Sequence, residues 1–447
     1  MPKASLVLRF LRKTFRLEWM PRWQRRVFFV AGGLAVGGIA VGIAYFADLA
    51  QTIFRAMHAA YWWSPLIVTP LGLGFSAWVT RRYAPNAAGS GIPQVIAAHQ
   101  IDTPSVRQSL VSIRTAIFKI VLLMFGLLCG ASAGREGPTI QVGAATMFAL
   151  GRLEPHRQPG LLLAGSAAGV AAAFNAPLAG IIFGIEEMSR SFEIRTSGLI
   201  LGTVIAAGLT SLALVGDYAY FGSTVATLPI GRGWLAVPLA GVVCGLAGGI
   251  FSRIVIEVSR GLPGRVGLLI KRYPIAFAIL CGLLIVLCAM LGHVDIYGTG
   301  YEEARAVLRG EETSAAFAPL KLITTALTMV SGIPGGLFSP SLSVGAGIGR
   351  NLAMILPNVP VAVLGVLCMA AYLTGVVQAP ITSFVIVSEM TENHALIIPI
   401  MLTVLIANSV SKMICSESVY HALSKRFLPA TPQTAVVAMT ATLTESR

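Results

Sequence analysis

Long apolar stretches separated by short polar breaks run along most of this chain, and they predict membrane helices. The first covers residues 27–46, and further stretches follow as far as residue 414. Their apolar positions are continuous rather than alternating, which favours helices over a membrane β-barrel. Several stretches, including 139–150, 319–330 and 381–387, are shorter than the roughly 20 residues that cross a bilayer. Short apolar segments cut by Gly and Pro are typical of transporters whose broken helices meet near the membrane midplane.

The composition strengthens this interpretation. Of the 447 residues, 55% are hydrophobic and 12% are charged, and the mean hydropathy is +0.77. A soluble domain carries about 25% charged residues. We therefore predict an all-α polytopic membrane protein.

The net charge of +14 fits basic loops on the cytoplasmic side and attraction to an anionic lipid bilayer, so we expect no nucleic-acid partner. Residues 1–26 hold eight basic side chains against one acid, Glu18, with Leu, Phe and Trp between them. This pattern predicts a basic amphipathic helix on the membrane surface and a cytoplasmic N-terminus. We expect a transmembrane domain over 27–425 and a short polar tail over 426–447.

Pairs of prolines mark an internal repeat. Pro138 and Pro177 are 39 residues apart, and Pro340 and Pro380 are 40 apart. In each half a glutamate follows the second proline by nine residues, at Glu186 and at Glu389. Two nearly equal spacings indicate duplicated halves, over about 27–215 and 234–425. The spacings alone are compatible with either a parallel or an inverted repeat.

Residues 134–138, Gly-Arg-Glu-Gly-Pro, place two charges inside an otherwise apolar region. Pro138 opens a further helical pattern, and Pro is favoured in the first turn of a helix. Backbone N–H groups at a helix start have no partner within the helix and carry the positive end of its dipole. Glu136 therefore lies at a natural anion-binding position. We interpret the segment as an anion site with a built-in competitor for the anion.

Two other breaks also combine glycines with proline, Gly-Ser-Gly-Ile-Pro at 89–93 and a longer segment at 332–340. Glycine allows the backbone to approach a ligand closely. If the three breaks converge, their N–H groups and the Ser90 hydroxyl form a cage of neutral donors that suits a small anion. The alternative is that each break is an ordinary helix kink, since Gly and Pro are common in membrane helices.

Glu186 and Glu187 end an apolar helix that begins near Pro177. Carboxylates within a membrane are costly and are functional candidates by default. Adjacent helical residues point about 100° apart, so at most one of the two need face a pathway. Both could instead be solvated at the membrane surface, and composition alone leaves the two interpretations open.

Nothing else in the sequence indicates an enzyme, a metal site or a cofactor. The six cysteines are scattered without a C-x-x-C pair and look like small apolar residues. The six histidines lie mainly outside the apolar stretches, without metal-ligand spacing. No pair of a nucleophile and a base is evident.

With these motifs the sequence resembles the CLC family of chloride channels and chloride/proton antiporters, from about residue 27 to 425. The breaks at 89–93, 134–138 and 336–340 are similar to the three signature segments of that family, in the same order, and the block 174–188 is also similar. The resemblance implies broken, tilted helices in two inverted repeats, and a homodimer with one pore per subunit.

The resemblance also implies roles for individual residues. Glu136 matches the external gating glutamate, which binds at an anion position. Ser90 and Tyr420 match the side-chain ligands of the central chloride. The backbone N–H groups of Leu337 and Phe338 are expected to complete that anion site.

Glu187 matches the internal proton-transfer glutamate of the family. An acid there favours secondary active transport of chloride in exchange for protons, gated by Glu136. The alternative is a passive voltage- or pH-gated chloride channel of the same fold, which usually has an apolar residue at this position. One departure is Gln94, where the family commonly has Glu.

The expected location is the inner membrane of a prokaryotic cell. No soluble domain is visible after residue 426, so nucleotide regulation is not expected. Chloride, protons, the lipid bilayer and a second copy of the chain are the expected partners.

Overall fold

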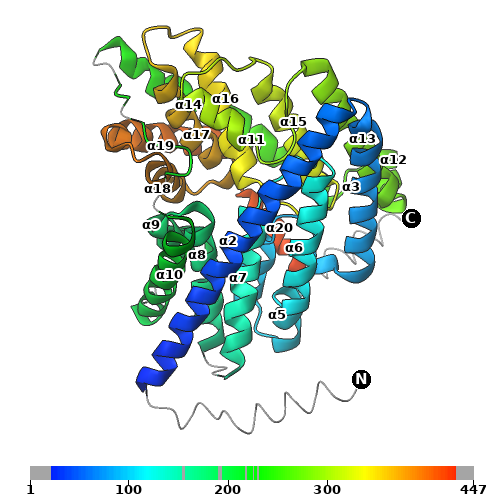
Figure 1. Ribbon diagram of the computed structural model, residues 1–447, viewed down its shortest axis with the longest axis vertical. Helices are drawn as coiled ribbons and strands as arrows, with labels where there is room; N and C mark the ends of the chain where they lie inside the picture. Colours follow the sequence, from blue (N-terminus) through cyan, green and yellow to red (C-terminus); the bar gives the residue numbers. More distant parts are fainter. Residues whose placement is uncertain are drawn as a thin grey trace, which may run out of the picture.

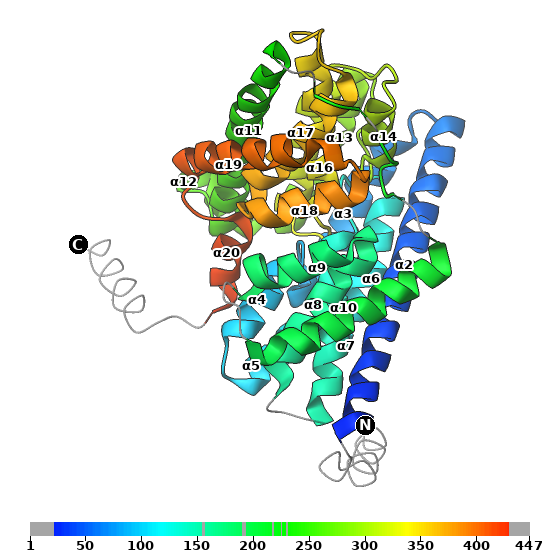
Figure 2. The ribbon, with the colours of Figure 1, turned by 90° about the vertical axis from the view of Figure 1, so that its left-hand side faces the viewer.

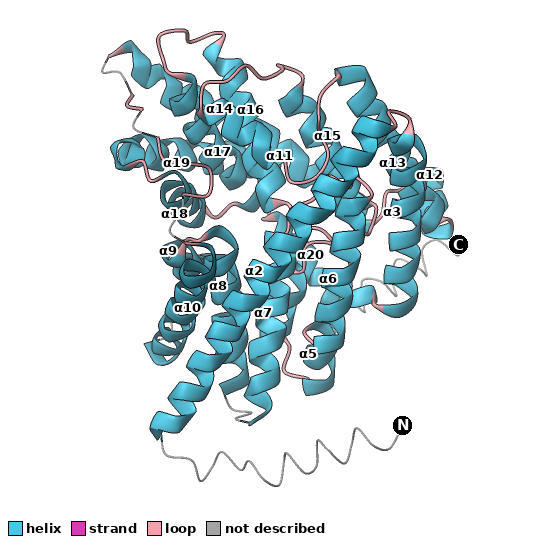
Figure 3. Cartoon of the chain, viewed as in Figure 1, coloured by secondary structure: helices cyan, strands magenta, loops and turns pink. Residues whose placement is uncertain are grey.

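The computed structural model describes residues 22–153, 157–189, 194–216, 219–224, 226–228 and 231–428. This part of the chain is almost entirely helical and contains no strand (Figures 1 and 3). The predicted surface helix and polar tail therefore lie mostly outside the described residues. The longer helices are α2 (Arg22–Ala60), α3 (Ser64–Tyr83), α6 (Ile113–Leu128), α7 (Glu136–Leu150), α8 (Gln158–Phe174), α10 (Ile194–Val215), α11 (Ala236–Arg260), α13 (Pro274–Gly292), α15 (Phe317–Val330), α16 (Phe338–Ala353), α17 (Val361–Val377) and α19 (Ile397–Ile414).

Shorter helices lie between these and complete the architecture. They are α4 (Ile92–Gln100), α5 (Pro104–Leu110), α9 (Pro177–Phe183), α12 (Gly264–Arg272), α14 (Tyr301–Leu308), α18 (Pro380–Thr391) and α20 (Val419–Ser424). Six stretches of the described residues are long and apolar enough to cross a membrane, whereas α8, α15 and α17 are apolar but shorter. The mixture of full and partial spans confirms the predicted all-helical membrane fold with broken helices.

The first helix, α2, is much longer than the apolar stretch that predicts it. It has 39 residues and continues past residue 46, because its later polar side chains bind other parts of the protein. Asp48 accepts an ion-pair contact from Arg135 at 2.6 Å. The Gln51 side-chain oxygen accepts a hydrogen bond from the Thr299 backbone N–H at 3.0 Å. Polar side chains that have partners elsewhere in the protein interrupt the apolar pattern of the sequence, but they do not end the helix.

Two matching corners reveal the repeat in the backbone. In the first half, α8 ends at Asn175, which has a positive φ of 52°, and Pro177 then starts α9. In the second half, α17 ends at Gln378, with a φ of 58°, and Pro380 starts α18. A left-handed residue commonly ends a helix, and Pro is favoured at the next helix start. The equal proline spacings in the sequence thus mark two equal helix–corner–helix units.

Each unit binds the other through a glutamate. Glu389, near the end of α18, accepts hydrogen bonds from the first N–H groups of α9, at Leu178 (3.0 Å) and Ala179 (2.7 Å). Glu186, just after α9, does the same for α18, accepting from the N–H groups of Ile381 (3.1 Å) and Thr382 (2.6 Å).

Each start of a short helix therefore lies at the end of the other, so α9 and α18 run antiparallel. Figure 2 shows α18 directly above α9, with α19 beyond α18 and α10 beyond α9. Corresponding helices that point in opposite directions make the repeat inverted.

The interior is formed by α7 packed on α8 in the first half and by α16 packed on α17 in the second. Small residues allow the close approach. A side chain at Gly349 of α16 would meet the backbone of α17 at Leu364. The start of α7 and the start of α16 meet at the centre of the molecule, where the candidate site lies.

Candidate functional site

Backbone hydrogen bonds join the three glycine-rich breaks. The Gly89 N–H donates to the Ile333 carbonyl at 3.0 Å, and the Gly335 N–H donates to the Gly89 carbonyl at 3.1 Å. Gly134 and Gly336 exchange two hydrogen bonds, at 2.8 and 2.7 Å. Breaks that are about 40 to 250 residues apart in the sequence therefore converge. This convergence is the condition under which the sequence predicts a cage of neutral donors.

Close approach explains the glycine after Glu136. A side-chain carbon at Gly137 would overlap the Ser90 hydroxyl and would lie 3.0 Å from the Ser90 carbonyl oxygen. Only hydrogen at this position lets α7 begin against the Ser90 break. The glycine thus positions both the first turn of α7 and the Ser90 side chain.

Glu136 is the first residue of α7 and is fully buried. Its carboxylate does not stay at the start of its own helix, however. It accepts hydrogen bonds from the Ser339 backbone N–H, at 3.3 Å, and from the Ser339 hydroxyl. Ser339 is in the first turn of α16, so the carboxylate lies at the positive end of the helix that opens the second half. A carboxylate of the protein thus occupies a helix start, the kind of position that attracts anions.

The other predicted ligands surround the same helix start. Phe338 is the first residue of α16, and Leu337 precedes it, so their N–H groups have no partner within the helix. The Tyr420 ring lies 5.9 Å from the Phe338 ring, between centroids. Helix α20, which carries Tyr420, packs against α4, which begins just after Ser90. The structure therefore brings Ser90, Leu337, Phe338 and Tyr420 to one place.

The two hydroxyls at this place are buried and lie next to each other. Ser90 is 2% exposed and Tyr420 is 0% exposed. The Tyr420 hydroxyl interacts with the Ser90 side chain, but neither oxygen forms a hydrogen bond of ordinary geometry with another described residue. Burying a poorly paired hydroxyl costs free energy. Two such donors beside a helix start fit a small anion as a shared ligand.

A buried lysine supports the Ser90 break from behind. The Lys119 ammonium is fully buried and donates a hydrogen bond to the Gly89 carbonyl at 2.7 Å. It takes up a carbonyl oxygen that would otherwise repel an anion.

Arg135 points away from its neighbour Glu136. Its guanidinium pairs with Asp48 at 2.6 Å, donates to the Ala44 carbonyl at 2.7 Å, and contacts the Tyr220 hydroxyl at 3.4 Å. These groups line a second cavity, of about 600 Å³, on the Arg135 side of Glu136. Arg135 therefore pairs with Asp48, and the Glu136 carboxylate makes its hydrogen bonds with α16 instead.

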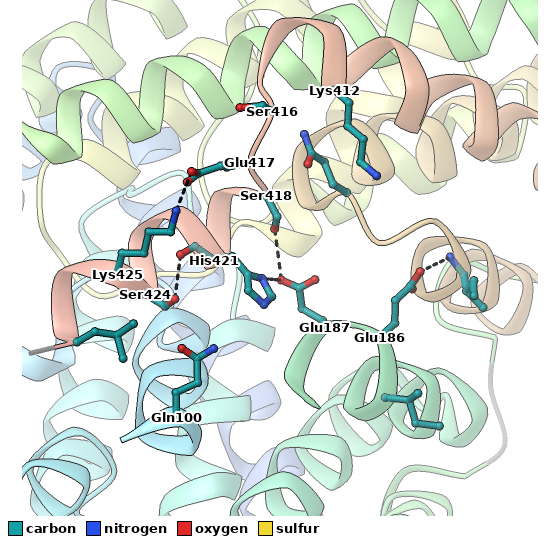
Figure 4. Close-up of a pocket in the computed structure, with 14 residues that line it drawn as sticks. Gln100, Glu186, Glu187, Lys412, Ser416, Glu417, Ser418, His421, Ser424 and Lys425 are labelled. Atoms are coloured by element: carbon teal, nitrogen blue, oxygen red, sulfur yellow. Dashed lines mark hydrogen bonds and ion pairs between the residues drawn. The ribbon is translucent and has the colours of Figure 1, made fainter. Parts of the chain in front are cut away.

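Glu187 lies on the opposite side of the molecule, at a cavity of about 760 Å³ (Figure 4). It belongs to η5 (Gly184–Ser189), a π-helical turn at the end of α9. Such turns are frequent at functional sites, because they redirect side chains. The Glu187 carboxylate lies 3.2 Å from His421 Nδ1 and 3.4 Å from the Ser418 hydroxyl. Glu186 points instead to α18, which separates the roles of the two adjacent acids.

Charged side chains of both signs line this cavity. Lys412, His421 and Lys425 line it. Glu417 also lines it, and pairs with Lys425 at 2.7 Å and with Arg260 at 2.9 Å. The hydrogen bond from Lys425 holds the pKa of the Glu417 carboxyl below its usual value.

Gln94 has a role that the sequence did not predict. Its side-chain amide donates to the carbonyls of Ala88, at 2.7 Å, and Asn86, at 3.2 Å. These residues lead into the Ser90 break. An ionised glutamate could not donate these hydrogen bonds, so Gln94 fixes the break in a way that depends on its amide. The departure at Gln94 therefore brings a direct contact with the backbone of the Ser90 break.

The sequence pattern does not single out two residues of the site. Ser339 is one polar residue within a glycine-rich break, and His421 is a histidine outside the apolar stretches. Their contacts join positions 203 and 234 residues apart. The one available signal was position: Ser339 is in the first turn of a glycine-preceded helix, and His421 directly follows Tyr420.

This fold and this geometry define a class: polytopic membrane proteins of two inverted halves, in which the starts of broken helices meet at the centre of the molecule. The family described as "Voltage gated chloride channel" matches residues 72–412. The chain belongs to this family.

Several known proteins are similar over most of the chain. The H(+)/Cl(-) exchange transporter ClcA of Vibrio parahaemolyticus is 31% identical over 392 residues, covering 82% of this chain and 80% of that protein. The crystal structure of a slow cyanobacterial Cl-/H+ antiporter matches with a TM-score of 0.76 and 25% identity, over 90% of this chain and 97% of that one. A CLC-type fluoride/proton antiporter shares the fold, with a TM-score of 0.72 at 22% identity, over 89% and 96% of the two chains.

Proposed function

We propose that this protein is a secondary active transporter that exchanges chloride for protons across the membrane. The observation that carries the proposal is the Glu136 carboxylate bound at the start of α16. An acid that occupies an anion position can leave it by taking up a proton or by yielding to an anion. One side chain can thereby couple the two ions. The similarity to a named H(+)/Cl(-) exchange transporter and to a Cl-/H+ antiporter supports this assignment.

Chloride is held by neutral donors in this mechanism. The ligands are the Ser90 and Tyr420 hydroxyls and the N–H groups of Leu337 and Phe338. Neutral dipoles bind an anion without the trapping strength of a full positive charge, which permits rapid release. Lys119 contributes at a distance, through the carbonyl that it binds.

Protons need a second acid on the other side of Glu136. Glu187 fits this role, since it is buried yet lies at the edge of a cavity. A proton that passes from Glu187 to Glu136 neutralises the carboxylate and releases it from α16. Chloride then occupies the freed position and moves in the direction opposite to the proton. The ion gradients drive the cycle.

Proteoliposomes with an outward or inward chloride gradient test the proposal directly. The wild-type protein should move protons uphill when chloride alone supplies the gradient. Glu136→Gln should abolish proton uptake while chloride still moves, because a neutral amide cannot carry the proton. Glu187→Gln should also stop protons and leave chloride flux. Glu257→Gln is a matched control, since Glu257 is an exposed acid paired with Arg253 on α11.

A passive chloride channel of the same fold is the alternative. The two are separated by the reversal potential under a pH gradient. A potential that shifts with the pH gradient supports exchange, and one that depends on chloride alone excludes it. Continued uphill proton transport by Glu136→Gln would instead remove Glu136 from the gating role.

The basic groups suggest which way the protein faces. Arg81 and Arg82 at the end of α3, with Lys412, Lys425 and Arg426, gather on the side of the Glu187 cavity. Membrane proteins keep such residues on the cytoplasmic side. We therefore place the Glu187 cavity and the N-terminus in the cytoplasm, and the cavity beside Arg135 outside. Labelling of single cysteines by an impermeant reagent in whole cells tests this orientation.

The homodimer remains part of the proposal. Large apolar side chains are exposed along α9, α18 and α19, including Leu178, Ile381, Ile398 and Leu405. The half-buried carboxylate of Glu389 lies in the same face. A second copy would cover this carboxylate better than lipid can. The molar mass of the purified protein in detergent, from light scattering, should be that of two chains.

A further inference from the structure

The Glu187 carboxylate is enclosed by protein. Its side chain is 3% exposed, whereas that of His421 is 14% exposed. The two hydrogen-bond partners found for Glu187 are the Ser418 hydroxyl and the His421 ring. His421 is therefore the more exposed member of the pair, and it borders both the acid and the cavity. Figure 4 places the His421 ring beside the carboxylate and at the edge of the open cavity.

The remaining charged groups around the cavity are engaged elsewhere or lie on its rim. Glu186 binds the start of α18. Glu417 is paired with Lys425 and Arg260. Lys412 is exposed on α19. Among the described residues that line the cavity, His421 is the imidazole that contacts Glu187, and an imidazole ring can both accept and donate a proton.

We propose that His421 carries protons between the water of the Glu187 cavity and Glu187 itself. The proposal rests on the proton-coupled exchange described above and adds an entry residue to it. Histidine suits the task because its two ring nitrogens can face different partners. Here Nδ1 faces Glu187, and the rest of the ring borders the cavity.

The proton moves in two steps. A hydronium ion in the cavity gives its proton to Nε2 of the neutral ring, which carries its own proton on Nδ1, and leaves water and an imidazolium. The Nδ1–H bond then breaks as an O–H bond forms on Oε1 of Glu187, which leaves a neutral imidazole and a neutral carboxyl group. Once the ring has turned away from Glu187, Nδ1 takes a proton from the cavity water and Nε2 returns its proton to that water, which restores the starting tautomer. Transport in the other direction reverses these steps.

The position of His421 adds a reason for coupling. It directly follows Tyr420, the chloride ligand, on the six-residue helix α20. The ring that would deliver the proton and the hydroxyl that would bind the anion therefore share one short rigid element. A movement of α20 would therefore displace both side chains together.

The first test uses His421→Asn in proteoliposomes of the full-length protein. Asparagine places an amide near the position of Nδ1 and keeps a hydrogen bond to Glu187, but it does not titrate. We expect chloride-driven proton flux at a cavity-side pH of about 7 to fall by about tenfold, less than a positioned acid–base group contributes to catalysis, since some water still reaches Glu187. The loss should shrink as the cavity side is acidified. A merely structural role would leave the pH profile unchanged.

The second test is chemical rescue. His421→Ala removes the ring beside a cavity of about 760 Å³, which has room for free imidazole. Imidazole added on the cavity side should restore proton flux in His421→Ala and leave wild type unchanged. Ser416→Ala, an exposed position on the same cavity, is the control and should behave as wild type. His421→Gln replaces His421→Asn if the latter does not fold.

The outcomes are distinct. If wild type exchanges the two ions but His421→Asn keeps the wild-type proton flux and pH profile, His421 is not the relay. Failure of imidazole to stimulate His421→Ala would equally overturn the proposal. If wild type itself moves no protons, the proposed exchange fails first, whatever the variants do.

Discussion

The segments Gly134–Pro138 and Gly336–Pro340 occupy equivalent positions in the two halves of the molecule, yet they differ in chemistry. Both follow a Gly-x-x-x-Pro pattern, and their first glycines pair through two backbone hydrogen bonds. The third residue is Glu136 in one half and Phe338 in the other. The fourth is Gly137 in one and Ser339 in the other. The first half contributes a carboxylate, and the second contributes the helix start and the hydroxyl that bind it.

The corners at α9 and α18 repeat the lesson. Glu186 and Glu389 are equivalent and make the same pair of backbone hydrogen bonds. The next residue is Glu187 in the first half and Met390 in the second. The shared residues hold the fold, whereas both acids proposed to carry protons belong to one half. Inverted symmetry thus builds the frame, and departures from it supply the transport chemistry.

The largest effect should come from adding a side chain at the fourth position of the first segment, Gly137. Gly137→Ala adds a carbon that overlaps the Ser90 hydroxyl and approaches the Ser90 carbonyl to 3.0 Å. Neither backbone can give way, because the breaks are hydrogen bonded to each other. We expect chloride flux in proteoliposomes to fall by more than about tenfold, the equivalent of about 1.4 kcal/mol at the site.

Gly202→Ala is the matched control for this change. A carbon at Gly202, on α10, meets nothing within 4 Å, and alanine is a better helix former than glycine. This variant should transport as wild type does. Normal flux in Gly137→Ala would mean that close contact with Ser90 is not needed for the anion site.

Much of this comparison could be predicted from the sequence, because the relevant residues cluster locally. Glycine, proline and an acid within five positions suffice to indicate a helix start that attracts anions. The equal proline spacings predict the duplicated corners. What could not be predicted is which helix start receives which side chain. Glu136 was expected at the start of its own helix, and it reaches α16 instead.

The missed features share one physical cause. Helix α2 was predicted only to residue 46, because Asp48, Gln51 and Arg55 interrupt its apolar pattern. Those side chains are satisfied by Arg135, by Thr299 and by Asp295, contacts that no local pattern contains. The role of His421 could not be predicted for the same reason, since its partner Glu187 is 234 residues away.

A smaller effect should follow from weakening the contact between the Glu136 carboxylate and the start of α16. Ser339→Ala removes the hydroxyl that binds the Glu136 carboxylate and keeps the backbone N–H. A hydrogen bond to a charged group contributes about 1.5–3 kcal/mol. Chloride should therefore displace the carboxylate more easily, and its apparent affinity should rise by about tenfold. Calorimetric titration of chloride at neutral pH measures this shift.

Ser343→Ala tests whether the effect is specific. Ser343 lies one turn further along α16, and its hydroxyl binds the Pro340 carbonyl. Its removal should leave chloride affinity unchanged. Equal affinities in wild type and Ser339→Ala would show that the hydroxyl does not hold the carboxylate at the anion position.

The smallest effect on transport should come from the residues that the halves share. Glu186→Ala and Glu389→Ala each remove two hydrogen bonds at the start of a short helix. Loss of such a cap costs about 1–2 kcal/mol, so both variants should unfold at lower temperature and by similar amounts. Their ratio of protons to chloride should stay at the wild-type value, because neither carboxylate is hydrogen bonded to Glu136 or Glu187. A thermal scan in detergent together with the flux ratio in proteoliposomes separates these effects. If Glu186→Ala alone changes the ratio, Glu186 belongs to the proton path, and the two corners differ in function as well as at residue 187.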